Sequence, residues 1–347
     1  MAAVVLACVL AAMLGFAAHR ASVCTVRAVA EVVSSRTAYM LASIVKSVLW
    51  VVAITLPIFL LMPSAGANLG GWPLTATAVV GGCVFGVGAA INGACAYSTI
   101  ARMVDGEGGM LVTAIAFALG VLGFVALVDV HWLERPTPAP ALVGALIGWA
   151  VVPALALAAW GAFEAVRLWR TRRQDLRLHH LALAPQYRLS SAAMLIGLAS
   201  SAIFLLFGAA SYTVTVQQVV EALRGTQSFP AAGRWILVVA MLSGMLFSTL
   251  QRGTFRLDWR PRLRWLRNLA GGLLMGFGVA LTPGGNDALV LYAIPTLSPH
   301  ALPAFLAMLV GIWLGLWGMR ALFAIEMRVA CRNDRYVTDA LDHRRSK

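Results

Sequence analysis

Residues 81–96 read GGCVFGVGAAINGACA, an apolar run with five glycines that is interrupted at Asn92-Gly93. The first part predicts a transmembrane helix that packs closely against a neighbour, because glycines let two helix backbones approach. The Asn92-Gly93 pair predicts that this helix ends inside the membrane and that a short second helix begins near Cys95. Such a break is tolerated only where the backbone is buried in protein or lines a cavity. We therefore expect this segment at the centre of a membrane protein.

The composition agrees with a membrane location. The chain has 347 residues, of which 60% are hydrophobic and 12% charged, and its mean hydropathy is +0.82. Long apolar runs with few charges predict an all-α protein that crosses the membrane many times. The formal net charge of +13 falls mainly in short loops between these runs, which indicates membrane orientation and not a nucleic-acid partner. The run after Met1 has no basic residues before it, so we expect a first span there and not a cleaved signal peptide.

The apolar runs predict about nine transmembrane spans. They lie at residues 2–18, 39–62, 74–102, 110–128, 141–168, 191–210, 235–250, 269–281 and 301–325. Segments 21–33 and 211–223 are shorter than the roughly 20 residues that a crossing needs, so we expect re-entrant or interfacial helices there. The spans at 74–102 and 269–281 are expected to be broken, the second restarting at 287–294. A polar, basic tail follows the last span.

Basic residues predict the orientation of these spans. The loops at 167–190 and 251–267 are rich in arginine, whereas those at 63–73 and 293–303 contain no lysine or arginine. The basic loops are expected in the cytoplasm. Nine spans then place the N-terminus outside and the C-terminus in the cytoplasm.

The sequence repeats itself with an offset of 190 positions. Residues of the same type recur at this offset in both halves. In the first half they are Gly81, Gly82, Gly86, Gly88, Ala90, Thr25 and Glu31, and in the second half, in the same order, Gly271, Gly272, Gly276, Gly278, Ala280, Thr215 and Glu221. The shared unit is span, short segment, span, broken span, span. One odd connecting span turns the second unit upside down, which is typical of transporters and channels. We expect a first half at 1–130, a connecting span and basic loop at 131–190, an inverted half at 191–325 and a cytoplasmic tail at 326–347.

The two breaks are candidate binding sites. A helix N-terminus presents unpaired N–H groups and a partial positive charge, so a half-helix that begins inside the membrane can hold an anion. The residues concerned are Asn92, Gly93 and Cys95 in the first break and Gly284, Gly285 and Asn286 in the second. The alternative is that the glycines serve only helix packing. Asp287 beside the second break would repel an anion, which weakens the anion-binding interpretation there.

Other cysteines and two basic residues are further candidates for the transport pathway, each with a structural alternative. Cys24 begins a short segment near Arg27, and both are expected to meet a passing anion. A membrane cysteine is more often a small apolar filler, and we accept that for Cys8 and Cys83. Lys46 lies inside a span, where a charge is functional by default, although lysine can also extend to the membrane surface from a helix end. The five cysteines are expected to be free thiols.

The chain resembles the YeeE/YedE sulphur-transport family over nearly its whole length. The resemblance is carried by GFAAHRASVC at 15–24, by GGCVFGVGAAINGACA at 81–96 with Arg102 and Gly106-Glu107-Gly108, and by the glycine-rich stretch from 271 to Asn286 with Leu297-Ser298. It implies an hourglass of two inverted halves in a bacterial inner membrane. Cysteines along its axis pass thiosulfate by S–H hydrogen bonds.

The resemblance also implies roles for individual residues. Cys24 and Cys95 match two of the family's cysteines, whereas the third falls at Gly285. Because one thiol of the family pattern is missing, we expect that the protein transports thiosulfate poorly or that it transports another sulfur or selenium species. The resemblance further implies a small cytosolic sulfurtransferase as a partner protein.

The predicted function is import of a small sulfur-containing anion, thiosulfate first, through a path lined by cysteines, without a cofactor, a metal or enzymatic activity. No phosphate-binding Gly-x-x-x-x-Gly-Lys-Ser/Thr run is present, so transport is expected to be passive or coupled to a gradient. One alternative is a membrane sulfur-relay component that carries a persulfide on Cys24 or Cys95. Another is a structural subunit that works only with a partner.

Overall fold

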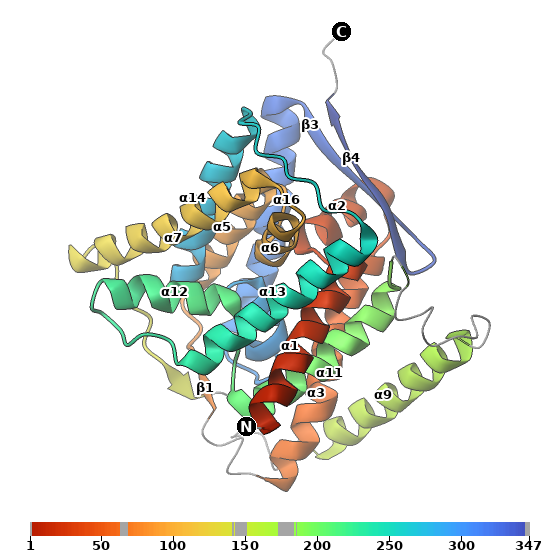
Figure 1. Cartoon of the computed structure of the whole chain (residues 1–347). Helices are drawn as coiled ribbons and strands as arrows, with labels where there is room; N and C mark the ends of the chain where they lie inside the picture. Colours follow the sequence, from red (N-terminus) through yellow and green to blue (C-terminus); the bar gives the residue numbers. More distant parts are fainter. Residues whose placement is uncertain are drawn as a thin grey trace.

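The computed structural model describes residues 2–62, 69–140, 142, 151–172, 184 and 186–343 of the chain. It is a bundle of long helices with several short ones inside it (Figure 1). The elements are α1 (Ala2–Ala21), α2 (Thr25–Ser35), α3 (Tyr39–Leu61), β1 (Gly70–Gly71), α5 (Ala76–Asn92), α6 (Ala96–Val104), α7 (Gly108–Asp129), β2 (Ala139–Pro140), α9 (Val151–Arg172), α11 (Leu189–Phe207), α12 (Tyr212–Leu223), α13 (Ala232–Arg252), α14 (Arg264–Leu281), α15 (Asn286–Ala288), a π-helical turn (Leu289–Ala293), α16 (Ala301–Phe323), β3 (Ile325–Arg332) and β4 (Arg335–His343).

The fold confirms an all-α protein that crosses the membrane many times. Within the described ranges, eight helical segments are long and apolar enough to span a membrane. The ninth predicted span corresponds to α14, which falls short of that apolarity because Arg264, Arg267 and Asn268 occupy its first turns. The predicted span at 141–168 lies partly outside the described residues, and its described part belongs to α9.

Helix packing reproduces the sequence repeat. The offset of 190 positions relates α1 to α11, α3 to α13, α5 to α14 and α7 to α16. The packing of α1 on α13 has its counterpart in that of α11 on α3, and the packing of α5 on α16 has its counterpart in that of α14 on α7. Each of these pairs joins a helix of the first half to a helix of the second half. Among the described residues, the most extensive helix packing therefore lies between the halves.

The central pair α5 and α14 shows that the halves are inverted. A Cβ on Gly81 would lie 2.9 Å from the carbonyl oxygen of Gly278, near the end of α14. A Cβ on Gly88 would lie 2.7 Å from the carbonyl oxygen of Gly271, nearer its beginning. The two helices thus run in opposite directions while occupying equivalent positions in the repeat. This arrangement confirms the predicted inverted repeat.

The connector and the C-terminal segment lie outside this central packing. Helix α9 lies at the edge of the bundle beside α3 (Figure 1). The residues expected as a polar tail form an antiparallel hairpin of β3 and β4 instead, at the end of the molecule opposite the start of α1 (Figure 1). Ser34 and Ser35 of α2 donate hydrogen bonds to the carbonyl oxygen of Val329 in β3. Alternating apolar residues in β3, such as Met327 and Val329, explain this strand.

Candidate functional site

The first break has the predicted form. Helix α5 ends at Asn92, and Gly93 follows with a left-handed φ of 76° and donates its N–H to the carbonyl oxygens of Ala89 and Ala90. Glycine adopts this conformation without a steric penalty. The chain then turns and begins α6, with Cys95 as the N-cap residue. A segment that reads as one apolar span is thus two helices.

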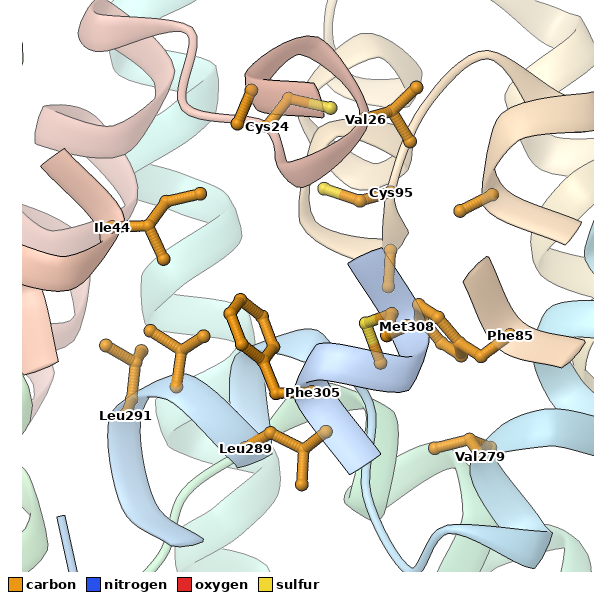
Figure 2. Close-up of a cluster of buried hydrophobic side chains, with 14 of the residues drawn as sticks. Cys24, Val26, Ile44, Phe85, Cys95, Val279, Leu289, Leu291, Phe305 and Met308 are labelled. Atoms are coloured by element: carbon orange, nitrogen blue, oxygen red, sulfur yellow. The ribbon is translucent and has the colours of Figure 1, made fainter. Parts of the chain in front are cut away.

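A second cysteine has the same role on a different helix. Cys24 is the N-cap residue of α2, and neither Cys24 nor Cys95 uses its side chain to cap its own helix. Both residues are 1% exposed. Figure 2 shows their sulfur atoms on the same side of an apolar cluster that includes Phe305, Met308 and Leu289. Both cysteines line the same cavity.

The second break brings a polar residue to the same place. Helix α14 ends at Leu281, and Gly285 is the N-cap residue of the short α15. Asn286, the first residue of α15, donates a hydrogen bond from Nδ2 to Thr25 Oγ1 at 3.4 Å. Its Oδ1 atom is buried and has no hydrogen-bond partner within the described part of the chain. Amide and hydroxyl groups from both halves therefore meet next to the thiols.

These groups line one cavity of about 60 Å³, which we call the cysteine cavity. Its polar lining residues include Cys24, Thr25, Cys95, Asn286 and Asp287, and its apolar ones include Ile44 and Leu291. A cavity needs only about 10–15 Å³ to hold one water molecule, so a small anion of a few heavy atoms fits here. The structure brings Cys24, Cys95 and Asn286 together, as the sequence suggested.

Asp287 also lines this cavity, and its carboxylate is hydrogen-bonded to the first residues of α12. It accepts hydrogen bonds from Ser211 Oγ at 2.7 Å, from the Tyr212 N–H at 3.1 Å and from Thr213 Oγ1 at 2.5 Å. These groups form the start of α12. The positive end of α12 offsets the carboxylate charge. No sequence pattern indicates this contact, because it joins two segments 74–76 residues apart.

Asn92 is placed in a different network. Its Nδ2 donates to the carbonyl oxygen of Ala94 and to Thr99 Oγ1, and its Oδ1 accepts from Thr113 Oγ1 and Asn268 Nδ2. All four distances are between 2.7 and 3.0 Å. The side chain thus joins α5, α6, α7 and α14 at the first break. It does not line the cysteine cavity.

The remaining predicted residues are distributed around the site. Gly93 and Gly284 form the turns of the two breaks with positive φ, and Gly285 packs against Thr213. Lys46 does not reach the cysteine cavity. Its Nζ atom lies 3.0 Å from Glu164 Oε1 on α9 and 2.7 Å from Ser190 Oγ. Arg27 lines a neighbouring cavity and lies over the Tyr336 ring of the hairpin, 5.1 Å from its centroid.

Comparison with known proteins bears on the chain as a whole. Residues 20–314 match the family model described as "Sulphur transport". The chain belongs to the sulphur transport family. It is also 33% identical over 81 residues to a protein of Salmonella typhimurium (strain LT2) named "Probable transporter YedE". That match covers 23% of this chain and 20% of the relative, so it spans about a fifth of the relative's length.

Proposed function

We propose that this member of the sulphur transport family imports a small sulfur-containing anion, thiosulfate first, across an inner membrane. The observation that carries the proposal is the meeting of two cysteine N-caps, Cys24 of α2 and Cys95 of α6, in one buried cavity. The family description and the membrane fold agree with this role.

The chemistry of the cysteine cavity suits a dehydrated sulfur anion. Helices α2 and α6 direct their N-terminal ends toward it, and these ends offer partial positive charge without a buried lysine. Thiols are weak, polarizable donors, which match a polarizable sulfur atom better than a compact oxyanion. Asn286 adds an amide to the same wall. Each interaction is weak enough for the anion to leave again.

The direction of transport follows from the predicted orientation. The arginine-rich loop at 251–267 would face the cytoplasm, with the N-terminus outside. An anion would enter from the outer face, pass between Cys24 and Cys95 at the centre of the inverted repeat, and leave toward the basic face. A small cytosolic sulfurtransferase is the partner that we propose to receive it there.

Uptake of radiolabelled thiosulfate into proteoliposomes tests the proposal. Wild-type protein should take up thiosulfate, and Cys95→Ala should lower the initial rate about tenfold, the effect of about 1.4 kcal/mol on a rate. Cys8→Ala is the matched control, because Cys8 is a partly exposed thiol of α1 that does not line the cysteine cavity. No uptake by folded wild-type protein would contradict the function. Equal rates for Cys95→Ala and wild type would contradict the path.

A sulfur relay is the second candidate, because Cys24 and Cys95 line the same buried cavity. In that reaction a thiolate attacks the outer sulfur of thiosulfate, the S–S bond of thiosulfate breaks, and sulfite leaves with the electron pair. A persulfide then remains on Cys24 or Cys95. Mass spectrometry of intact protein after incubation with thiosulfate distinguishes the two functions. An added sulfur atom that disappears in Cys24→Ala or Cys95→Ala would favour the relay over simple transport.

A further inference from the structure

A second cavity lies directly beside the cysteine cavity. Its volume is about 130 Å³, roughly twice that of the cysteine cavity at about 60 Å³. The two cavities share Ala18, Val23 and Tyr97 as lining residues. An anion that leaves the thiols on this side therefore has only one layer of side chains to pass. We call the second space the arginine cavity.

The arginine cavity has an excess of positive charge. It is lined by Arg27, Arg102 and Arg252, and by the single carboxylate of Asp105. Asp105 Oδ1 already accepts a hydrogen bond from Thr249 Oγ1 at 2.9 Å and lies 3.1 Å from His19 Nε2. His19 and Thr249 therefore engage part of the Asp105 carboxylate.

Arg102 and Arg252 differ in whether a carboxylate neutralises their charge. Arg102 makes two hydrogen bonds with Glu107, at 2.8 and 2.7 Å. Arg252 makes no hydrogen bond or ion pair with any residue that the structure describes, and it is close enough to Arg20 to repel it. Bringing an anion to such a guanidinium breaks no existing contact in the protein. Arg252 is therefore better placed than Arg102 to bind an anion.

A hydroxyl group is available at the shared wall. Tyr97 belongs to α6, two residues after Cys95, and lines both cavities. Its OH is buried and has no partner among the described residues. A buried hydroxyl without a partner costs free energy unless water or a ligand satisfies it. An anion that passes the wall can accept this hydrogen bond.

We propose that the arginine cavity is a second anion site, which binds a doubly charged tetrahedral oxyanion on the inner side of the cysteine cavity. Guanidinium groups match the oxygen atoms of such anions and bind them by charge-assisted hydrogen bonds. The cysteine cavity would recognise sulfur, and the arginine cavity would recognise double charge. The binding site stands on its own geometry, whereas its place as the exit step of import rests on the proposed function.

Binding of radiolabelled sulfate to the purified full-length protein tests the site, because sulfate has the charge of thiosulfate but no outer sulfur. Arg252→Gln should weaken sulfate binding at least tenfold. Arg260→Gln is the matched control, since Arg260 is an exposed arginine of the same loop and removes the same charge. Arg252→Lys should keep part of the affinity, which separates loss of charge from misfolding. The double variant Cys24→Ala/Cys95→Ala should bind sulfate as wild type does.

The outcomes separate this site from the proposed function. Unchanged sulfate binding in Arg252→Gln, an equal loss in Arg260→Gln, or loss in the double cysteine variant would overturn the arginine site, even if thiosulfate uptake proceeds. Sulfate binding that depends on Arg252 would support the site even if the protein takes up no thiosulfate. Lower thiosulfate uptake by Arg252→Gln, together with weaker sulfate binding, would support its place in the exit path.

Discussion

Gly88 and Gly271 face each other where α5 crosses α14. A Cβ on either residue would lie 2.7 Å from the carbonyl oxygen of the other. This reciprocal contact follows from the inverted repeat, in which α5 and α14 are equivalent helices that run antiparallel. The absence of side chains lets the two backbones touch, and the two broken helices are thereby held next to each other. The position of both breaks depends on this crossing.

Alanine at either position should therefore weaken the protein. Gly88→Ala and Gly271→Ala are each expected to destabilise it by about 1–3 kcal/mol, because the methyl group meets backbone atoms that can move only with the whole helix. The two variants should lower the thermal midpoint in detergent by similar amounts. Gly123→Ala in α7 is the control, because no atom lies within 4 Å of its added Cβ. An equal loss for Gly123→Ala would contradict the packing argument, because alanine by itself favours a helix more than glycine does.

Particular residues show why the fold was predictable from the sequence. The apolar runs gave the long helices, and the Asn92-Gly93 pair gave the first break, because glycine alone accepts the left-handed turn easily. The repeat gave the inversion, since an odd connector reverses the second half. The hairpin at Ile325–His343 was missed because a short alternating pattern next to a long apolar span resembles a polar tail.

The sequence was less informative about side-chain partners. The family resemblance implied that Cys24 and Cys95 lie along one axis, and both line the same cavity. The partners of Lys46 and Asn92 could not be deduced, because Glu164 and Asn268 lie 118 and 176 positions away and carry no shared pattern. Tertiary contacts of this kind appear only when the helices are packed.

Asn92 should prove to be a structural residue with an indirect effect on transport. Asn92→Ala removes four hydrogen bonds and leaves Thr113 and Asn268 buried without this partner. Each buried group left unsatisfied costs about 1–3 kcal/mol, so the thermal midpoint should fall strongly. Asn268→Ala should give a fall in the same direction, and the double variant should lose less than the sum of the two. Full additivity would show that the two amides act independently.

His300 should make stability sensitive to mild acid. It is buried in the loop before α16, and burial lowers its pKa from 6.5 to about 4. Between these values the unfolded chain binds a proton that the folded protein does not, so stability is lost as the pH falls from about 6.5 to 4 and is constant above. The full effect is about 3 kcal/mol, at about 1.4 kcal/mol for each pH unit of difference.

Thermal midpoints measured between pH 4 and pH 8 check this dependence. His300→Gln should flatten the decline between pH 6.5 and pH 4. His131→Gln, which replaces an exposed histidine, should keep it. A decline of unchanged slope in His300→Gln would mean that other groups cause the acid sensitivity.

Thr213 should determine whether a thiol can be placed at the second break. A Cβ on Gly285 would lie 2.7 Å from Thr213 Cγ2 and 2.8 Å from Thr213 Oγ1, so Gly285→Cys alone should lower the thermal midpoint. Thr213→Ala removes both atoms, at the cost of the hydrogen bonds that Thr213 Oγ1 makes with Asp287, with Ser211 and with the Gly285 N–H. The double variant Gly285→Cys/Thr213→Ala should therefore be more stable than the sum of the single changes predicts, by about 0.5–3 kcal/mol.

A thiol at position 285 would join Cys24 and Cys95 as a third donor, so the double variant should also take up thiosulfate faster than Thr213→Ala alone. Thr226→Ala combined with Gly285→Cys is the control, because Thr226 bonds to the carbonyl oxygen of Glu221 and lines neither cavity, so its effect should be additive. Additive behaviour of Thr213→Ala with Gly285→Cys would refute the packing argument. Faster uptake only in the double variant would show that Thr213 occupies the space that a third thiol needs.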